Sequence, residues 1–97
     1  MKIIWSPLAV DRISEIAEYI AQDNLNASVK WIDNIFKKIE QLGKFPESGR
    51  IVPEMSRNNI RELIYENYRI VYRIESEQIS ILTVRHFKQI LPSEEIN

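Results

Sequence analysis

Residues 60–86 read IRELIYENYRIVYRIESEQISILTVRH, and this stretch decides the fold. Apolar and polar side chains alternate along it with a period of two, and β-branched and aromatic residues are frequent, as is typical of half-buried strands. The polar pairs Glu66-Asn67 and Ser76-Glu77 interrupt the alternation and are suited to tight turns. The stretch therefore predicts an antiparallel meander of three strands, at residues 60–66, 68–75 and 78–86.

A short strand and a first helix are expected before the meander. Lys2–Trp5 is apolar enough for a strand, and Ser6 followed by Pro7 makes a favourable N-cap and first helical residue. Beyond them apolar residues fall at helical spacing, so we expect a helix that runs to about Gln22. The apolar positions are Ala9, Ile13, Ile16, Ala17 and Ile20.

A second amphipathic helix is expected after a polar turn at residues 23–26. Gly43 is a candidate C-cap for it, and Pro46 confirms the stop. Trp31 lies at the edge of the apolar stripe, so it could pack into the core or contact a partner, and both alternatives stay open. Two helices joined by so short a turn are expected to form an antiparallel hairpin. The apolar positions of the second helix are Val29, Ile32, Ile35, Phe36, Ile39 and Leu42.

These elements together predict an α+β fold in a single domain, residues 1–97. The expected order is an N-terminal strand, an antiparallel helix hairpin and the three-stranded antiparallel meander, with the helices packed on one face of the sheet. The segment 45–59 is long for so small a domain, which indicates a functional loop or one packed by its own side chains. The polar tail 92–97 is expected to fray.

Composition narrows the class of protein further. The 97 residues are 44% hydrophobic and 28% charged, as in an ordinary globular protein. No apolar run reaches the length of a membrane span, and no signal peptide is expected. The absence of cysteine fits a cytoplasmic protein, and with a single histidine it leads us to expect no metal site and no cofactor. A net charge of −1 argues against tight non-specific binding of nucleic acid.

The register of the last two strands predicts which side chains share a face. If Ser76-Glu77 is a two-residue turn, Ile70 faces Thr83, and that apolar face should cover the helix hairpin. The opposite, helix-free face then carries both Arg69 and His86 near one end of the sheet. Such a pair is suited to a functional groove, and the alternative is an ordinary solvated face.

Arginines concentrate in the second half of the chain, which holds six of the seven. The planar guanidinium group binds phosphate or carboxylate groups well, and the alternative is ordinary surface pairing with nearby glutamates. The face that Arg61 occupies stays open, because one more residue in the turn at Glu66-Asn67 would reverse it. The candidate binding residues are Arg50, Arg61, Arg73, Arg85 and Phe87.

The order of the elements and several short motifs resemble the RelE/ParE family of bacterial toxins. The resemblance covers nearly the whole chain, from Trp5 to about Leu91, and it rests on several motifs in order, since no single one is specific. The matching segments are Trp5-Ser6-Pro7-Leu8-Ala9, Pro46-Glu47-Ser48-Gly49-Arg50, Ile60-Arg61-Glu62-Leu63, Tyr68-Arg69-Ile70-Val71-Tyr72-Arg73 and Val84-Arg85-His86-Phe87.

The resemblance implies the toxin component of a type II toxin–antitoxin module, which inhibits growth until a cognate antitoxin protein binds it. A hetero-oligomer with the antitoxin is therefore expected. ParE-like members poison DNA gyrase, whereas RelE-like members cleave mRNA in the ribosomal A site without a metal. The P-x-x-G-R and R-E-L segments and the long helix hairpin favour the ParE-like branch. The alternatives are a RelE-like mRNA endoribonuclease and a non-toxic protein-binding module of the same fold.

If the chain is a nuclease, it needs a base, an acid and a cation on the phosphate. By the resemblance, Arg69 matches the phosphate-binding arginine and His86 matches the acid/base histidine of some RelE-like members. Phe87 stands where those members have a catalytic tyrosine, and the loop lacks the lysine pair that others use. Glu54 or Glu47 is the candidate base. The catalytic set of the nuclease alternative is Arg69, His86 and Glu54.

Overall fold

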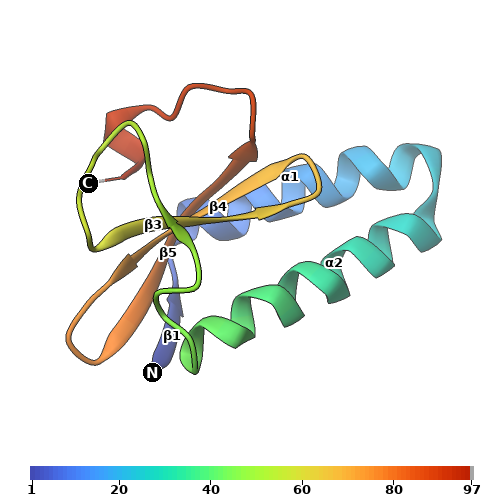
Figure 1. Ribbon diagram of the computed structural model, residues 1–97. Helices are drawn as coiled ribbons and strands as arrows, with labels where there is room; N and C mark the ends of the chain where they lie inside the picture. Colours follow the sequence, from blue (N-terminus) through green and yellow to red (C-terminus); the bar gives the residue numbers. More distant parts are fainter. Residues whose placement is uncertain (97) are drawn as a thin grey trace.

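The computed structural model describes residues 1–96 and has an α+β fold with one five-stranded mixed sheet (Figure 1). The strands lie in the order β1-β5-β4-β3-β2, with β1 parallel to β5 and the other neighbours antiparallel. The predicted fold class and the predicted order of strand, helix hairpin and meander are confirmed. The elements are β1 (Lys2–Trp5), α1 (Pro7–Asp23), α2 (Leu25–Glu40), β2 (Arg50–Ile51), β3 (Ile60–Tyr65), β4 (Tyr68–Ile74) and β5 (Gln78–His86), with 3-10 turns at Gln41–Gly43 and Ser93–Glu95.

The helix hairpin begins and turns at capping residues. The Ser6 side chain accepts a hydrogen bond from the Ala9 amide at 3.0 Å, which confirms the predicted cap of α1. Asn24 alone separates the helices, and its side chain caps α2. The Ser28 hydroxyl donates to the Ala17 carbonyl at 2.6 Å and ties the helices together. In Figure 1 they run side by side on one side of the sheet.

The predicted C-cap at Gly43 is wrong. Helix α2 ends at Glu40 and continues into the 3-10 turn, and no glycine within residues 1–96 has a positive φ. Gly43 instead lies against the N-terminus, where its carbonyl accepts a hydrogen bond from the amino group of Met1 at 2.7 Å. A glycine is therefore suited to position 43 because two backbone segments approach closely there, and not because the backbone is left-handed.

The main core lies between the helices and one face of the sheet. Trp31 is 4% exposed and belongs to this core, which settles whether it packs inside or projects outward. Its ring packs edge-on against Tyr68 of β4 with the centroids 5.4 Å apart. The buried sheet residues of this core are Leu63, Ile70, Tyr72, Ile79, Ile81 and Val84.

A β-bulge changes the register of β5, and the predicted faces are wrong beyond it. Up to Ile81 the pairing follows the predicted two-residue turn, but Leu82 is an extra residue on β5. Beyond the bulge Ile70 pairs with Val84 rather than with Thr83. Val84 and the following alternate residue, His86, therefore face the helices, because a shift of one residue reverses the faces of a strand.

The other face of the sheet is covered, whereas both the functional groove and the alternative of a solvated face required it to be open. A second apolar cluster lies there, in which Leu91 and Ile96 of the C-terminal segment are 4% and 1% exposed. The prediction of a frayed tail is therefore wrong up to Ile96, while Asn97 lies outside the described residues. Figure 1 shows the green loop and the red C-terminal segment together on this side. The buried members of the cluster are Val52, Ile60, Val71, Leu82, Leu91 and Ile96.

The segment 45–59 contains a strand that the sequence analysis missed. Arg50 and Ile51 form β2, which pairs with Glu62 and Arg61 of β3 at the edge of the sheet. A strand of two residues is too short for alternation to reveal it. Of the two interpretations offered for this segment, packing by its own side chains holds, since Val52 is fully buried.

Candidate functional site

Arg69 lies at the centre of a buried network of alternating charges. Its side chain is 5% exposed, and its Nε atom donates to Glu62 at 2.6 Å. Its two terminal nitrogens donate to both oxygens of Glu54 at 2.8 Å, which is the bidentate geometry favoured by guanidinium groups. Arg50 donates to the second oxygen of Glu62 at 2.7 Å. The network thus runs Glu54–Arg69–Glu62–Arg50 across the helix-free face.

These contacts determine what Arg69 and Glu54 can do chemically. The hydrogen bonds from Arg69 lower the pKa of the Glu54 carboxyl from its ordinary 4.5 to about 2. The same pairing raises the pKa of Arg69. A carboxylate held this strongly in its ionised form is a poor proton acceptor near neutral pH. An arginine whose nitrogens already face two carboxylates is likewise unsuited to capturing a phosphate.

His86 lies on the other face of the sheet from Arg69. It pairs with Tyr68 at the end of β5, and its ring packs edge-on against that tyrosine with the centroids 6.0 Å apart. On its other side the ring stacks on Phe87 with the centroids 5.3 Å apart. The bulge at Leu82 thus separates the histidine from the arginine with which the sequence analysis grouped it.

The other predicted binding arginines are engaged to different degrees. Arg61 lies opposite Tyr72, on the helix-facing side, and donates to the Gly49 carbonyl at 3.0 Å. Arg73 makes one long contact with Glu75 at 3.4 Å. Arg50 pairs with Glu62, yet its side chain is 62% exposed. Among the candidate arginines, Arg50 thus offers the most surface to a partner.

Arg85 belongs to a second charge cluster that holds the C-terminal segment. Its guanidinium group donates to both oxygens of Glu95, which also accepts from Thr83 at 2.8 Å and from Arg12 of α1 at 3.2 Å. These contacts, that of Arg85 first, lower the pKa of Glu95 to about 2. Glu95 could not be predicted from the sequence, because its partners lie on β5 and α1, far from it in the chain.

We expect the stability to depend on pH through Glu95. A carboxyl whose pKa is lowered on folding stabilises the folded state above its unfolded pKa near 4.5, and this stabilisation is lost as the pH falls toward 2. Glu95→Gln should therefore melt below the wild type at pH 7. The difference in melting temperature should shrink below about pH 4, as the wild-type carboxyl takes up its proton. Circular dichroism melts from pH 7 to 2 measure it, and a constant difference would contradict the assignment.

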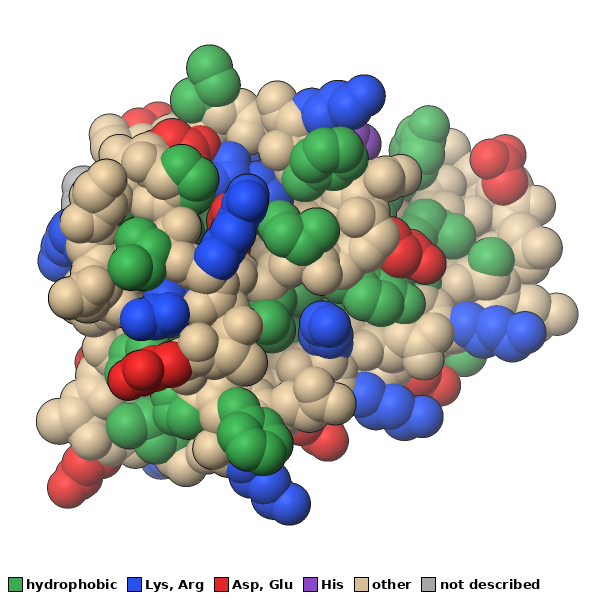
Figure 2. All heavy atoms as spheres, viewed as in Figure 1, with side chains coloured by type: hydrophobic (Ala, Val, Ile, Leu, Met, Phe, Trp, Pro, Cys, Tyr) green, Lys and Arg blue, Asp and Glu red, His purple; other side chains and the backbone are tan. Residues whose placement is uncertain are grey.

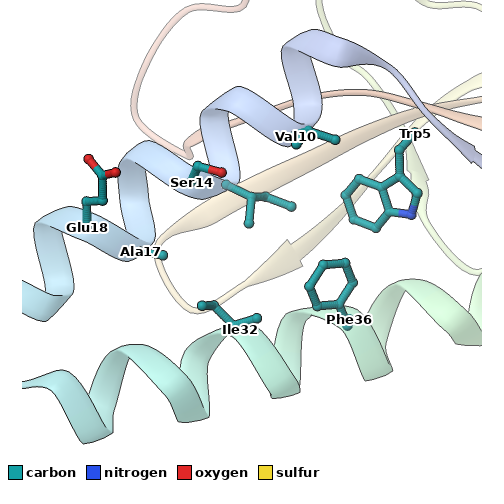
Figure 3. Close-up of a pocket in the computed structure, with 8 residues that line it drawn as sticks. Trp5, Val10, Ser14, Ala17, Glu18, Ile32 and Phe36 are labelled. Carbon is teal, nitrogen blue, oxygen red and sulfur yellow. The ribbon is translucent and has the colours of Figure 1, made fainter.

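An apolar cleft lies in the helix hairpin and was not predicted from the sequence. It is a cleft of about 600 Å³ between α1, α2 and β1 (Figure 3). Trp5 and Phe36 face one another at one end, with their ring centroids 5.1 Å apart. Phe36 and Val10 are 39% and 49% exposed, so their apolar side chains are accessible from the cleft. Most of the other lining side chains are also apolar. The lining residues are Trp5, Val10, Ile13, Ser14, Ala17, Glu18, Ile32 and Phe36.

The described residues offer little for metal binding. No group of three or more His, Cys, Asp or Glu side chains in residues 1–96 is arranged to hold a metal ion. Over the same residues no helix has the length and apolar character needed to cross a membrane.

Fold and site together define a small α+β protein with an apolar cleft on one side and buried charge pairs on the other. A family model described as "ParE toxin of type II toxin-antitoxin system, parDE" matches residues 3–91. The chain is 36% identical over 93 residues to the "Putative toxin Y4kP" of Sinorhizobium fredii, covering 94% of this chain and 93% of the relative. The chain therefore belongs to the ParE toxin family of type II toxin–antitoxin systems.

A solved structure supports the fold assignment independently. The structure described as "Chromosomal ParDE TA system from P. aeruginosa" matches with a TM-score of 0.75 at 19% sequence identity. The match covers 91% of this chain and 97% of the other. The predicted resemblance to the RelE/ParE toxins, with the ParE-like branch favoured, is confirmed.

Proposed function

We propose that this toxin poisons DNA gyrase by binding and carries no nuclease site. The observation that carries the proposal is the position of Arg69, which is buried and paired with Glu54 and Glu62. His86 lies on the opposite face, and Phe87 has no hydroxyl group with which to donate a proton. The three groups that metal-free RNA cleavage requires therefore do not converge on one phosphate. Gyrase is cytoplasmic, and we expect the toxin to act there.

We further propose that a cognate antitoxin neutralises the toxin by inserting an apolar segment into the cleft between α1 and α2. Membership in a family of type II toxins supports such a partner, as does the description of the structural neighbour as a ParDE system. An amphipathic helix suits the cleft, because the groove lies between two helices and has apolar walls. Glu18 and Ser14 at its rim offer polar contacts to the outer face of such a helix.

A paired assay of the purified toxin separates the proposed target from the alternatives. We expect inhibition of supercoiling by purified gyrase and no cuts in mRNA on translating ribosomes. Cleavage of mRNA without an effect on gyrase would establish the RelE-like alternative. A folded chain that affects neither target and does not arrest growth would be a non-toxic binding module.

His86→Ala tests the same proposal through one side chain. General acid–base help is worth roughly 10²–10⁴-fold, so loss of the histidine would silence a nuclease. A toxin that acts by binding needs no proton carrier. We therefore expect His86→Ala to inhibit gyrase within about tenfold of the wild type, which is a smaller loss than a nuclease would suffer. Phe87→Tyr is the companion variant, because it restores the hydroxyl of the nuclease pattern. A gain of mRNA cleavage in Phe87→Tyr would count against gyrase poisoning.

A further inference from the structure

Large apolar side chains are exposed at one end of the sheet, away from the cleft. Ile64, Phe87 and Ile90 are 40%, 41% and 83% exposed. Ile64 pairs with Arg69 between β3 and β4, and the Phe87 amide donates to the Asn67 carbonyl in the adjoining turn at 2.7 Å. All three thus lie where β3 and β5 end. In Figure 2 hydrophobic side chains gather beside the histidine on this part of the surface.

The buried charge network holds this surface in place. Arg69 donates to the Gln89 carbonyl at 3.1 Å, and the Leu91 amide donates to Glu54 at 3.2 Å. The backbone is therefore fixed on both sides of Ile90, although the side chain of Ile90 is almost fully in solvent. An apolar side chain displayed on an anchored backbone loses little conformational freedom when it binds a partner.

The exposed charges beside Phe87 and Ile64 include two cations, Lys88 and Arg50, and one carboxylate, Glu66 of the adjoining turn. The Nζ atom of Lys88 lies 5.9 Å from the centre of the Phe87 ring. Arg50 is largely exposed beside Glu62, and Arg50 and Arg69 together balance the two carboxylates of Glu62 and Glu54, so among the described residues Lys88 is the unpaired cation at this rim. A complementary partner would therefore place carboxylates around an apolar depression.

We propose that Ile64, Phe87 and Ile90, with Lys88 and Arg50 at the rim, form the surface by which the toxin binds its target protein. This proposal rests on the proposed function, which makes the chain a toxin that acts by binding. The occupant is an apolar pocket of a protein with an acidic border. Protein is favoured over nucleic acid because the centre of the surface is apolar and the net charge of the chain is −1.

Ile90→Asp tests this target-binding surface, and Leu25→Asp is its matched control. Both replace a highly exposed aliphatic side chain, at 83% and 68%, but Leu25 lies at the tip of the helix hairpin. We expect Ile90→Asp to lose at least about tenfold in gyrase inhibition and to abolish growth arrest, as at an interface hot spot. Leu25→Asp should retain both activities. The melting temperature of each variant shows that folding is intact.

Binding of the antitoxin provides the second readout. Ile90→Asp should bind the cognate antitoxin with unchanged affinity, whereas Val10→Asp in the cleft should weaken that affinity and remain toxic. Growth arrest and antitoxin affinity would then depend on separate surfaces. If Ile90→Asp inhibits gyrase as strongly as the wild type, the target-binding surface is refuted while the proposed target stands.

The remaining outcomes are also decisive. Growth arrest by the wild type without gyrase inhibition, lost in Ile90→Asp, would refute gyrase but retain this surface for another protein target. A wild type that neither arrests growth nor inhibits gyrase would refute both proposals. Retention of plasmid DNA by the wild type in gel shifts, lost in Lys88→Ala, would replace the protein partner with a nucleic acid.

Discussion

Arg69→Ala is expected to destabilise the fold severely, not merely to silence the toxin. The substitution leaves the fully buried carboxylate of Glu62 without its buried partner and frees Glu54 from its bidentate contact. Breaking a buried ion pair from one side costs about 3–5 kcal/mol. Small domains have only about 5–15 kcal/mol of stability in all. Urea denaturation followed by circular dichroism should show the loss.

Two comparison variants make this expectation specific. Arg50→Ala removes the other partner of Glu62, but its side chain is 62% exposed, so we expect a loss of no more than about 1 kcal/mol. The double variant Arg69→Met with Glu62→Leu should recover most of the stability, because apolar side chains of similar volume often replace a buried pair without loss. Arg69→Ala with a wild-type denaturation midpoint and no toxicity would instead assign Arg69 a direct part in the toxic activity.

The position of Arg69 also shows where prediction from the sequence stopped. Alternation located all three strands of the meander and both turns, because turns of two residues leave a clear break in the pattern. Alternation could not predict which face of the sheet each β5 residue occupies beyond Leu82, because the bulge inserts one residue there. The adjacent apolar pair Ile81-Leu82 is the mark of this bulge in the sequence, since each residue packs into a different core.

The covering of the second face was beyond local patterns for another reason. Leu91 and Ile96 are isolated apolar residues in a polar segment, and neither periodicity nor capping signals apply to them. Their burial depends on Glu54 and Glu95, whose ion pairs join segments distant in the chain. The residues of the candidate site were therefore predicted from the sequence, but their positions relative to one another were not. Arg69 and Glu54 do meet, as a closed ion pair, and His86 does not join them.

The motif Pro46-Glu47-Ser48-Gly49-Arg50 can now be explained physically. Gly49 packs directly beneath Tyr72, whose hydroxyl group accepts a hydrogen bond from the Gly49 amide at 3.0 Å. The same hydroxyl donates to the Pro46 carbonyl at 2.7 Å. The Gly49 carbonyl accepts from Arg61 at 3.0 Å, so the loop is fixed to the sheet on both sides of the glycine. The motif is therefore a loop closed around a buried tyrosine, and it sets where β2 begins.

Gly49→Ala is expected to be the second severe substitution. An added Cβ would lie 2.5 Å from the Tyr72 hydroxyl oxygen and 2.6 Å from the Glu62 carbonyl oxygen, and the latter is backbone of β3 that cannot turn aside. Overpacking of this kind costs about 1–3 kcal/mol. Loss of the tyrosine hydrogen bonds would add about 1 kcal/mol for each bond broken. We therefore expect a clear fall in the denaturation midpoint, together with loosening of β2 in hydrogen exchange.

The other glycine of the chain supplies the control for this expectation. A Cβ at Gly43 would lie 3.1 Å from the Met1 carbonyl oxygen, at the N-terminus, where a displacement of a few tenths of an ångström relieves the contact. Neither glycine has a positive φ. The two alanine substitutions therefore differ in the space available for the Cβ atom and not in backbone conformation. Gly43→Ala should therefore shift the midpoint far less than Gly49→Ala. Equal midpoints for the two variants would mean that the close packing of Gly49 against Tyr72 and β3 is not what requires a glycine there.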